Sequence, residues 1–220
     1  MKMNKDSGFR TLLVLAVLLL VAFAAFTYFV KTYDVAPVGY NGADIGFSSL
    51  NVAAHDLFPG DKESYELTKI LGYICLMAVA VNGLEAVIDF FKQRGRVGRM
   101  HRRNIITCIY YVVVGGFYVL FEFFVINSRP ISAEASYPSS HTMLALCVLY
   151  SVFVLLGFSS WRYRFMASLF RVICIVAMVS MVVFRFLSGV HWLTDICGGI
   201  LLSLSLMCFY RACIARFCGR

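Results

Sequence analysis

The chain has 220 residues and a net charge of +8; 60% of its residues are apolar and only 15% are charged. The apolar residues form blocks long enough to cross a hydrocarbon core of about 30 Å as helices, which excludes an ordinary soluble domain. We therefore expect an all-α polytopic membrane protein in which residues 1–220 form a single domain.

The first apolar block, Leu12–Val30, follows Lys2, Lys5 and Arg10, a flank that can also begin a secretory signal peptide. The block is longer than the apolar region of a signal peptide, so we predict a retained membrane helix. Five further blocks follow at about Ile70–Phe91, Asn104–Ile126, His141–Phe158, Met166–Phe184 and Thr194–Ala212. The sequence therefore predicts a bundle of six transmembrane helices.

The longest connection is an outer loop at about residues 31–69, between the first two predicted helices. Within it, residues 45–58 mix apolar side chains with Asn51, His55 and Asp56 at near-helical spacing. This pattern predicts an amphipathic segment that lies on the membrane surface. We interpret His55 as an interfacial residue rather than a catalytic one.

The distribution of lysine and arginine predicts the orientation, because basic residues of short loops stay on the cytoplasmic side. With both termini cytoplasmic, fifteen of the twenty basic residues lie inside: Lys2, Lys5, Arg10, Lys92, Arg94, Arg96, Arg99, Arg102, Arg103, Arg162, Arg164, Arg171, Arg211, Arg216 and Arg220. The other five lie outside: Lys31, Lys62, Lys69, Arg129 and Arg185. The positive charge therefore reflects topology and attraction to anionic lipids, and we expect membrane lipids and no nucleic acid as partners. The expected location is the plasma membrane.

The eight cysteines suggest neither disulfides nor a metal site. Each lies in an apolar segment or on the predicted inner side, where oxidised pairs do not form. The chain also lacks the CxxC and Cys/His spacings of metal sites. We expect small apolar packing residues, with no metal and no cofactor.

Three short polar stretches begin or end the predicted helices of the second half of the chain. They are Arg129-Pro130, Pro138-Ser139-Ser140-His141, and Arg185 with His191 and Asp195. Taken singly, each residue is consistent with an ordinary helix cap or loop residue. The predicted topology brings all three stretches to the outer face, however, and charged groups near a membrane are costly unless they have a function.

This set of side chains is suited to phosphate chemistry. Two arginines offer planar forks for phosphate oxygens, and a serine at a helix start adds a hydroxyl and free N–H groups. Asp195, four residues after His191, can hold one imidazole nitrogen while the other attacks phosphorus. His141 can act as general acid for the leaving oxygen. The cationic side chains can neutralise the developing charge without a metal.

With these spacings the chain resembles the type 2 phosphatidic acid phosphatases, a family related to glucose-6-phosphatase and the vanadium haloperoxidases. The family pattern is Lys, six residues, Arg-Pro; then Pro-Ser-Gly-His; then Ser-Arg, five residues, His, three residues, Asp. The resemblance implies that His191 forms a phosphohistidine, that Asp195 orients it, and that His141 protonates the leaving group and later activates water. It also implies phosphate-binding roles for these residues: Arg129, Ser139, Ser140 and Arg185.

Three positions depart from the family pattern. Glu122 stands where the family has Lys, Ser140 replaces Gly, and Phe184 replaces Ser. Glu122 is the most consequential change because an acid replaces a phosphate-binding cation. It could pair with an arginine, bind a cationic headgroup, or mark weakened or lost activity.

We therefore expect a metal-independent integral membrane phosphatase that acts at the outer membrane face on a lipid phosphomonoester or pyrophosphate. Phosphatidic acid, phosphatidylglycerol phosphate and polyprenyl pyrophosphate are equally compatible substrates. Two alternatives stay open: a lipid phosphotransferase that uses the same intermediate, and a non-catalytic phospholipid-binding or transport protein that retains the phosphate pocket.

Overall fold

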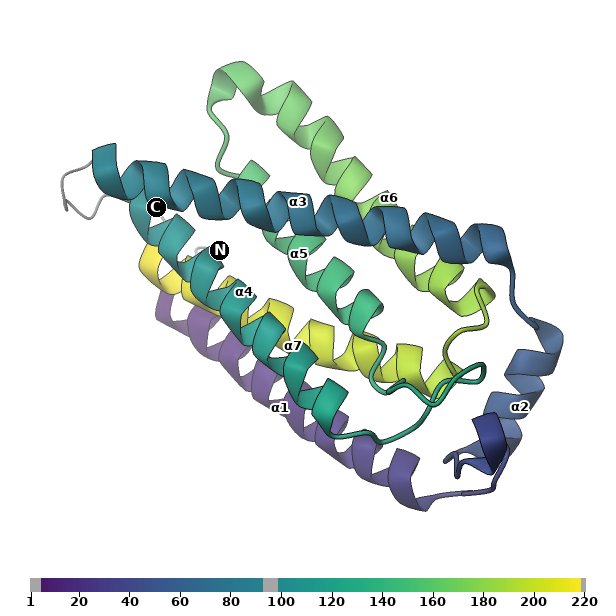
Figure 1. Ribbon diagram of the computed structural model, residues 1–220. Coiled ribbons are helices and arrows are strands. Elements are labelled where there is room, and N and C mark those ends of the chain that lie inside the picture. The colour runs from purple at the N-terminus through teal and green to yellow at the C-terminus, as the bar shows by residue number, and fades with distance from the viewer. Residues whose placement is uncertain (1–4, 93–98, 219–220) are drawn as a thin grey trace.

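The computed structural model describes residues 5–92 and 99–218. Within these residues the chain forms seven α-helices and no strand (Figure 1). The helices are α1 (Lys5–Thr32), α2 (Ser48–Leu57), α3 (Lys62–Lys92), α4 (Arg99–Phe123), α5 (Ser140–Leu156), α6 (Arg164–Leu187) and α7 (Leu193–Cys218). Two short 3₁₀ turns, Tyr40–Gly42 and Trp161–Tyr163, complete the described elements. The all-α prediction is confirmed.

The six predicted membrane helices correspond to α1 and to α3 through α7, but the count of six spans is approximate. Among the described residues, five helices are long and apolar enough to cross a membrane. The exception is α5, whose 17 residues extend only about 26 Å at 1.5 Å per residue. It packs against α3, α4, α6 and α7, so the other helices rather than lipid surround it. A short helix is tolerated in this central position.

The outward faces of the long helices are apolar, as a lipid environment requires. On α3, Tyr73 and Met77 are 63% and 65% exposed, and on α6 Val176 and Val179 are each 59% exposed. Apolar side chains would not be left open to water in such numbers, whereas lipid tails solvate them. The chain is a multi-pass membrane protein.

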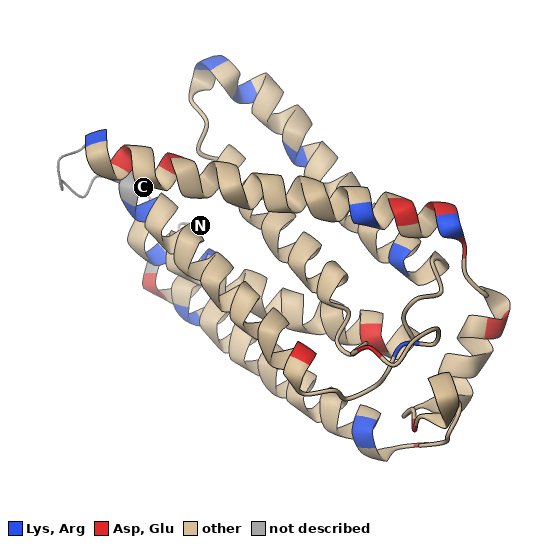
Figure 2. Ribbon diagram, in the orientation of Figure 1, with Lys and Arg blue, Asp and Glu red and all other residues tan. Residues whose placement is uncertain are grey.

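The connections between helices divide between the two ends of the bundle (Figure 1). The segments 33–61, 124–139 and 188–192 lie together at one end, and α1 begins and α7 ends at the other. Lysine and arginine colour much of the terminal end in Figure 2. Of the basic residues used to predict the orientation, Lys2, Arg94, Arg96 and Arg220 lie outside the described residues.

The predicted amphipathic segment forms helix α2, but its polar residue Asn51 is turned toward the protein while Asp56 stays exposed. Asn51 is fully buried, and its Nδ2 donates to the Gly46 carbonyl (2.8 Å) and the Thr194 hydroxyl (2.9 Å). The Thr194 N–H in turn donates to Asn51 Oδ1 (3.2 Å). The His55 ring lies 5.7 Å from the Trp192 ring. Helix α2 is thus tied to the start of α7 rather than only resting on a membrane surface.

Two aspartates stabilise the helix starts in this loop. The Ser49 N–H donates to Asp34 (2.9 Å) at the start of α2, and the Ser64 N–H and hydroxyl donate to Asp61 (2.9 and 2.6 Å) at the start of α3. These hydrogen bonds favour the charged carboxylates and hold the pKa of Asp34 and of Asp61 below the usual value. These hydrogen bonds therefore order the loop, which covers one end of the bundle.

Candidate active site

Arg185, at the end of α6, is the centre of the polar cluster. Its side chain is fully buried, and its Nη1 donates to the Thr68 hydroxyl of α3 (3.2 Å). Its Nη2 contacts His191 Nε2 at 3.0 Å and His141 Nδ1 at 3.4 Å. The predicted cluster is therefore assembled, with one guanidinium joining both histidines.

The contacts of Arg185 define which ring nitrogens carry protons. A guanidinium group only donates hydrogen bonds, so His191 Nε2 and His141 Nδ1 must both accept. Burial and the positive charges of Arg185 and Arg129 hold the pKa of His191 well below its usual value. His191 is therefore a neutral imidazole with its proton on Nδ1 and a lone pair on Nε2.

Asp195 lies in the first turn of α7, while His191 precedes the helix in the α6–α7 turn. The closest approach of His191 Nδ1 to Asp195 Oδ2 is 3.7 Å, too long for a hydrogen bond. The Ser136 hydroxyl lies between them, 2.9 Å from Nδ1 and 2.5 Å from Oδ2. Asp195 also accepts from the Trp192 N–H (2.9 Å) and from Asn127 Nδ2 (3.4 Å). The carboxylate is thus close to His191, but a serine intervenes.

Arg129 lies in a tight loop that Ser128 and Ala135 close through a β-bridge. Its backbone N–H donates to the Glu134 carbonyl (3.0 Å), and its Nη1 forms an ion pair with the Glu134 carboxylate (2.9 Å). Its Nε is buried and, within the described chain, has no hydrogen-bond partner. The Arg129 guanidinium is therefore partly engaged by a neighbouring acid, and its positive charge acts on His191.

The two serines of the second motif differ in accessibility. Ser139 is fully buried; its hydroxyl bonds to the Thr142 hydroxyl (3.0 Å), and its N–H donates to the Asp195 carbonyl (2.9 Å). Ser140 is partly exposed and lines the open space beside His141. The Ser139 N–H thus links the start of α5 to α7, whereas the Ser140 side chain is accessible from the cavity.

A cavity of about 490 Å³ lies between α3, α4 and α5 and reaches His141. The polar side chains in its lining are those of Tyr65, Lys69, Tyr73, Tyr118, Ser140 and His141, and the rest of the lining is apolar. Gly72 faces His141, since a Cβ at Gly72 would lie 3.6 Å from the imidazole Cδ2. Because α3 and α4 are membrane spans, this cavity connects the histidine with the level of the lipid.

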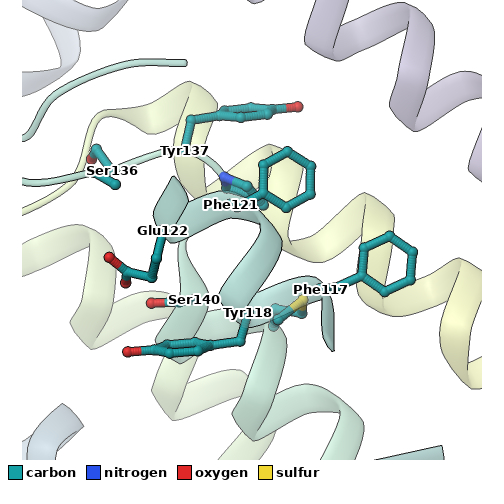
Figure 3. A pocket seen from close by; sticks show the side chains of 10 residues that line it. Phe117, Tyr118, Phe121, Glu122, Ser136, Tyr137 and Ser140 are labelled. Atoms are coloured by element: carbon teal, nitrogen blue, oxygen red, sulfur yellow. The ribbon is translucent and has the colours of Figure 1, made fainter. Parts of the chain in front are cut away.

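Glu122 extends from α4 toward the same region. Figure 3 shows its carboxylate on the side where the Ser140 and Tyr118 oxygens also lie, beside a space of about 10 Å³ that can hold one water. Its neighbour in this region is Tyr118, one turn earlier on the same helix (Figure 3). Glu122 forms no ion pair with any described residue. An arginine partner for Glu122, one expectation from the sequence, is absent from the described part of the chain because Arg129 pairs with Glu134.

Four residues of this cluster were not expected from the sequence: Thr68, Asn127, Glu134 and Ser136. None belongs to a recognisable motif, and single polar residues near helix ends are common. The one available signal is that Tyr65, Thr68 and Gly72 follow the spacing of a single helix face. A face of small and polar residues on an apolar span indicates contact with protein rather than with lipid.

Comparisons with known proteins agree with this architecture. The chain is similar in structure to the first transmembrane PAP2 type phosphatidylglycerolphosphate phosphatase from Bacillus subtilis, with a TM-score of 0.58. The two chains share 17% sequence identity, and the match covers 90% of this chain and 93% of the other. No curated protein sequence matches the chain significantly. The family model of the PAP2 superfamily matches residues 13–217, nearly the whole chain, so this protein belongs to the PAP2 superfamily.

Proposed function

We propose that this protein is a metal-independent lipid phosphatase that forms a phosphohistidine on His191. The observation that carries the proposal is the contact of one buried guanidinium, that of Arg185, with His191 Nε2 and with His141 Nδ1. A phosphate bound by Arg185 therefore meets an unprotonated nitrogen of one histidine and lies beside the second. Membership of the superfamily supports a phosphatase role.

The chemistry follows from the proton positions. Phosphate oxygens accept hydrogen bonds from the N–H groups of Arg185, in place of the histidines, and from the unpaired Nε–H of Arg129. The His191 Nε2 lone pair is then free to attack phosphorus. Once Arg185 turns its N–H groups to the phosphate, His141 Nδ1 is free to bind a proton, and the ring becomes cationic. As the nitrogen–phosphorus bond forms, the bond to the leaving oxygen breaks, and that oxygen takes the Nε2 proton of this cation, which leaves His141 neutral. His141 then removes a proton from the water that cleaves the intermediate. The arginines offset the negative charge of both transition states.

The cavity between α3 and α4 supports a lipid rather than a soluble substrate. It joins His141 to the level of the membrane spans, so acyl or prenyl chains can remain in the bilayer while the phosphate reaches Arg185. The structurally similar Bacillus subtilis protein is described as a phosphatidylglycerolphosphate phosphatase, which places that lipid among the substrates to test. Phosphatidic acid and polyprenyl pyrophosphate complete the set.

The test is phosphate release by purified protein in detergent with EDTA present, across these three lipids and a soluble phosphomonoester. We expect turnover of at least one lipid, little turnover of the soluble ester, and an acid-labile phosphoprotein that His191→Ala abolishes. Binding of lipid phosphate without release would establish the non-catalytic alternative. Transfer of phosphate to an added alcohol in preference to water would establish the phosphotransferase.

A further inference from the structure

The link between His191 and Asp195 contains a third residue. Ser136, in the segment before the second motif, places its Oγ 2.9 Å from His191 Nδ1 and 2.5 Å from Asp195 Oδ2, whereas the direct distance between ring and carboxylate is 3.7 Å. Ser136 comes from a part of the chain 59 residues before Asp195. A carboxylate that only hydrogen-bonded its histidine would leave no room for this hydroxyl.

The contacts of Arg185 and Ser136 indicate the direction of each hydrogen bond in this chain of atoms. The guanidinium of Arg185 can only donate, so His191 Nε2 accepts and the single proton of the neutral ring is on Nδ1. The Ser136 hydroxyl donates to Asp195, so its oxygen accepts from the Nδ1–H. The sequence of donors is therefore ring N–H to hydroxyl oxygen, then hydroxyl O–H to carboxylate.

The protein holds Ser136 firmly in this place. Its N–H donates to the Asn127 carbonyl (2.9 Å), and the next residue, Tyr137, is buried among aromatic side chains with its hydroxyl 2.8 Å from that of Thr27. Ser136 is 2% exposed, His191 3% and Asp195 0%. Bulk water therefore does not replace the hydroxyl if it is removed, and both the ring N–H and the carboxylate lose a partner.

We propose that Ser136 is a positioning residue that holds His191 in its nucleophilic tautomer and transmits the charge of Asp195 to the ring. This inference rests on the phosphatase function proposed above. When Nε2 bonds to phosphorus, the imidazole keeps its Nδ1 proton and becomes cationic. The carboxylate stabilises that cation through the hydroxyl, and the electrons return to Nε2 when water cleaves the nitrogen–phosphorus bond.

The activity test compares Ser136→Ala with Ser205→Ala. Ser205 is an equally buried serine whose hydroxyl bonds to the Ala16 carbonyl between α7 and α1, so its loss controls for removing one buried hydrogen bond. We expect Ser136→Ala to lower kcat by about 10- to 100-fold, as for other partners that orient a functional histidine, with KM nearly unchanged. Ser136→Thr, which keeps the hydroxyl, should recover most of the rate. Ser205→Ala should retain the wild-type kcat.

A double-mutant cycle separates a relay from two independent effects. If Asp195 acts through Ser136, the double variant Ser136→Ala/Asp195→Asn should be no slower than Asp195→Asn alone. Multiplied losses would mean that the two residues act separately and would overturn the relay. If Ser136→Ala does not fold, Ser136→Cys provides the test, because the weaker donor should lower kcat while the thermal midpoint holds.

A spectroscopic measurement distinguishes failure of the relay from failure of the phosphatase function. The chain has four histidines, so ¹⁵N-histidine labelling gives few ring signals. The signals of His191 are those that disappear in the His191→Asn variant. Wild type should show the Nδ1–H tautomer, and Ser136→Ala should shift toward a mixture. If wild type releases no phosphate but Ser136→Ala still changes the tautomer of His191, the phosphatase function would be refuted and the positioning role would stand. Unchanged shifts and unchanged kcat in Ser136→Ala would overturn the positioning role.

Discussion

His191→Ala should cause the most complete loss of activity, because His191 Nε2 carries the lone pair proposed to attack phosphorus and lies 3.0 Å from Arg185, closer than His141 Nδ1 at 3.4 Å. We expect His191→Ala to abolish turnover. Asp195→Asn should lower turnover by about 10⁴, the cost of losing the orienting carboxylate of a comparable triad. Lipid phosphate hydrolysis measures both effects, and His55→Ala, which changes a histidine outside the cluster, should keep the wild-type rate. Residual turnover in His191→Ala above a trace would refute the assignment of the nucleophile.

Glu122 forms no ion pair with any described residue, which argues against an arginine pair, one of the three roles that the sequence leaves open for it. Because its side chain is exposed and forms no ion pair in the described chain, exchanging its charge breaks no buried contact. Glu122→Lys should therefore fold as well as wild type and bind vanadate about fivefold more tightly, since a repelling charge near the phosphate becomes an attracting one. Glu122→Gln should fall between the two. A marked drop in the thermal midpoint of Glu122→Lys would restore the structural account.

The buried, neutral state of His191 predicts how stability depends on pH. Its pKa in the folded protein lies well below the unfolded value of about 6.5, because of burial and the nearby arginines. Below about pH 6.5 the unfolded chain binds a proton that the folded protein does not, so the contribution of His191 to stability is present above that pH and is lost as pH falls. The thermal midpoint of wild type, relative to His191→Asn, should therefore decrease from pH 8 to pH 5. A constant difference would mean that folding leaves the pKa of His191 unchanged.

At the scale of the helices, α2 is coupled to the site through one side chain. Asn51 forms three hydrogen bonds, two of which tie α2 to Thr194, the residue before Asp195, at the start of α7. Asn51→Ala leaves buried polar groups unpaired, at about 1–3 kcal/mol each. We expect a lower thermal midpoint and a lower kcat. Asp56→Ala, on the exposed side of the same helix, should change neither, and equal behaviour of the two variants would argue against this coupling.

At the scale of the whole molecule, the proposed orientation places the site outside the cell and both termini in the cytoplasm. Ala133 is exposed near Arg129 at the site end, and Ser160 is exposed in the α5–α6 connection at the opposite end. In a background without the eight native cysteines, Cys at position 133 should react with an impermeant thiol reagent added to intact cells, and Cys at position 160 should react only after lysis. The reverse pattern would invert the topology and move the site to the cytoplasmic face.

The sequence by itself determined that the protein is helical, that it lies in a membrane, and that its polar stretches meet at one end. These properties follow from local patterns, because a span must satisfy its own backbone hydrogen bonds and therefore appears as a long apolar block. The order of those blocks then brings Arg129, His141 and His191 to the same end. The sequence also predicted a helical segment near His55, though not the inward direction of Asn51.

Only the tertiary structure decided which polar atoms meet. Thr68 reaches Arg185 across 117 residues of sequence, and Ser136 reaches Asp195 across 59. Glu134, rather than the Glu122 that the family pattern brings to attention, pairs with Arg129. Each of these contacts depends on how far two elements approach and how they rotate, to within a fraction of an ångström. Hydrogen bonds are this sensitive to distance and angle, and residue spacing along one chain does not contain that information.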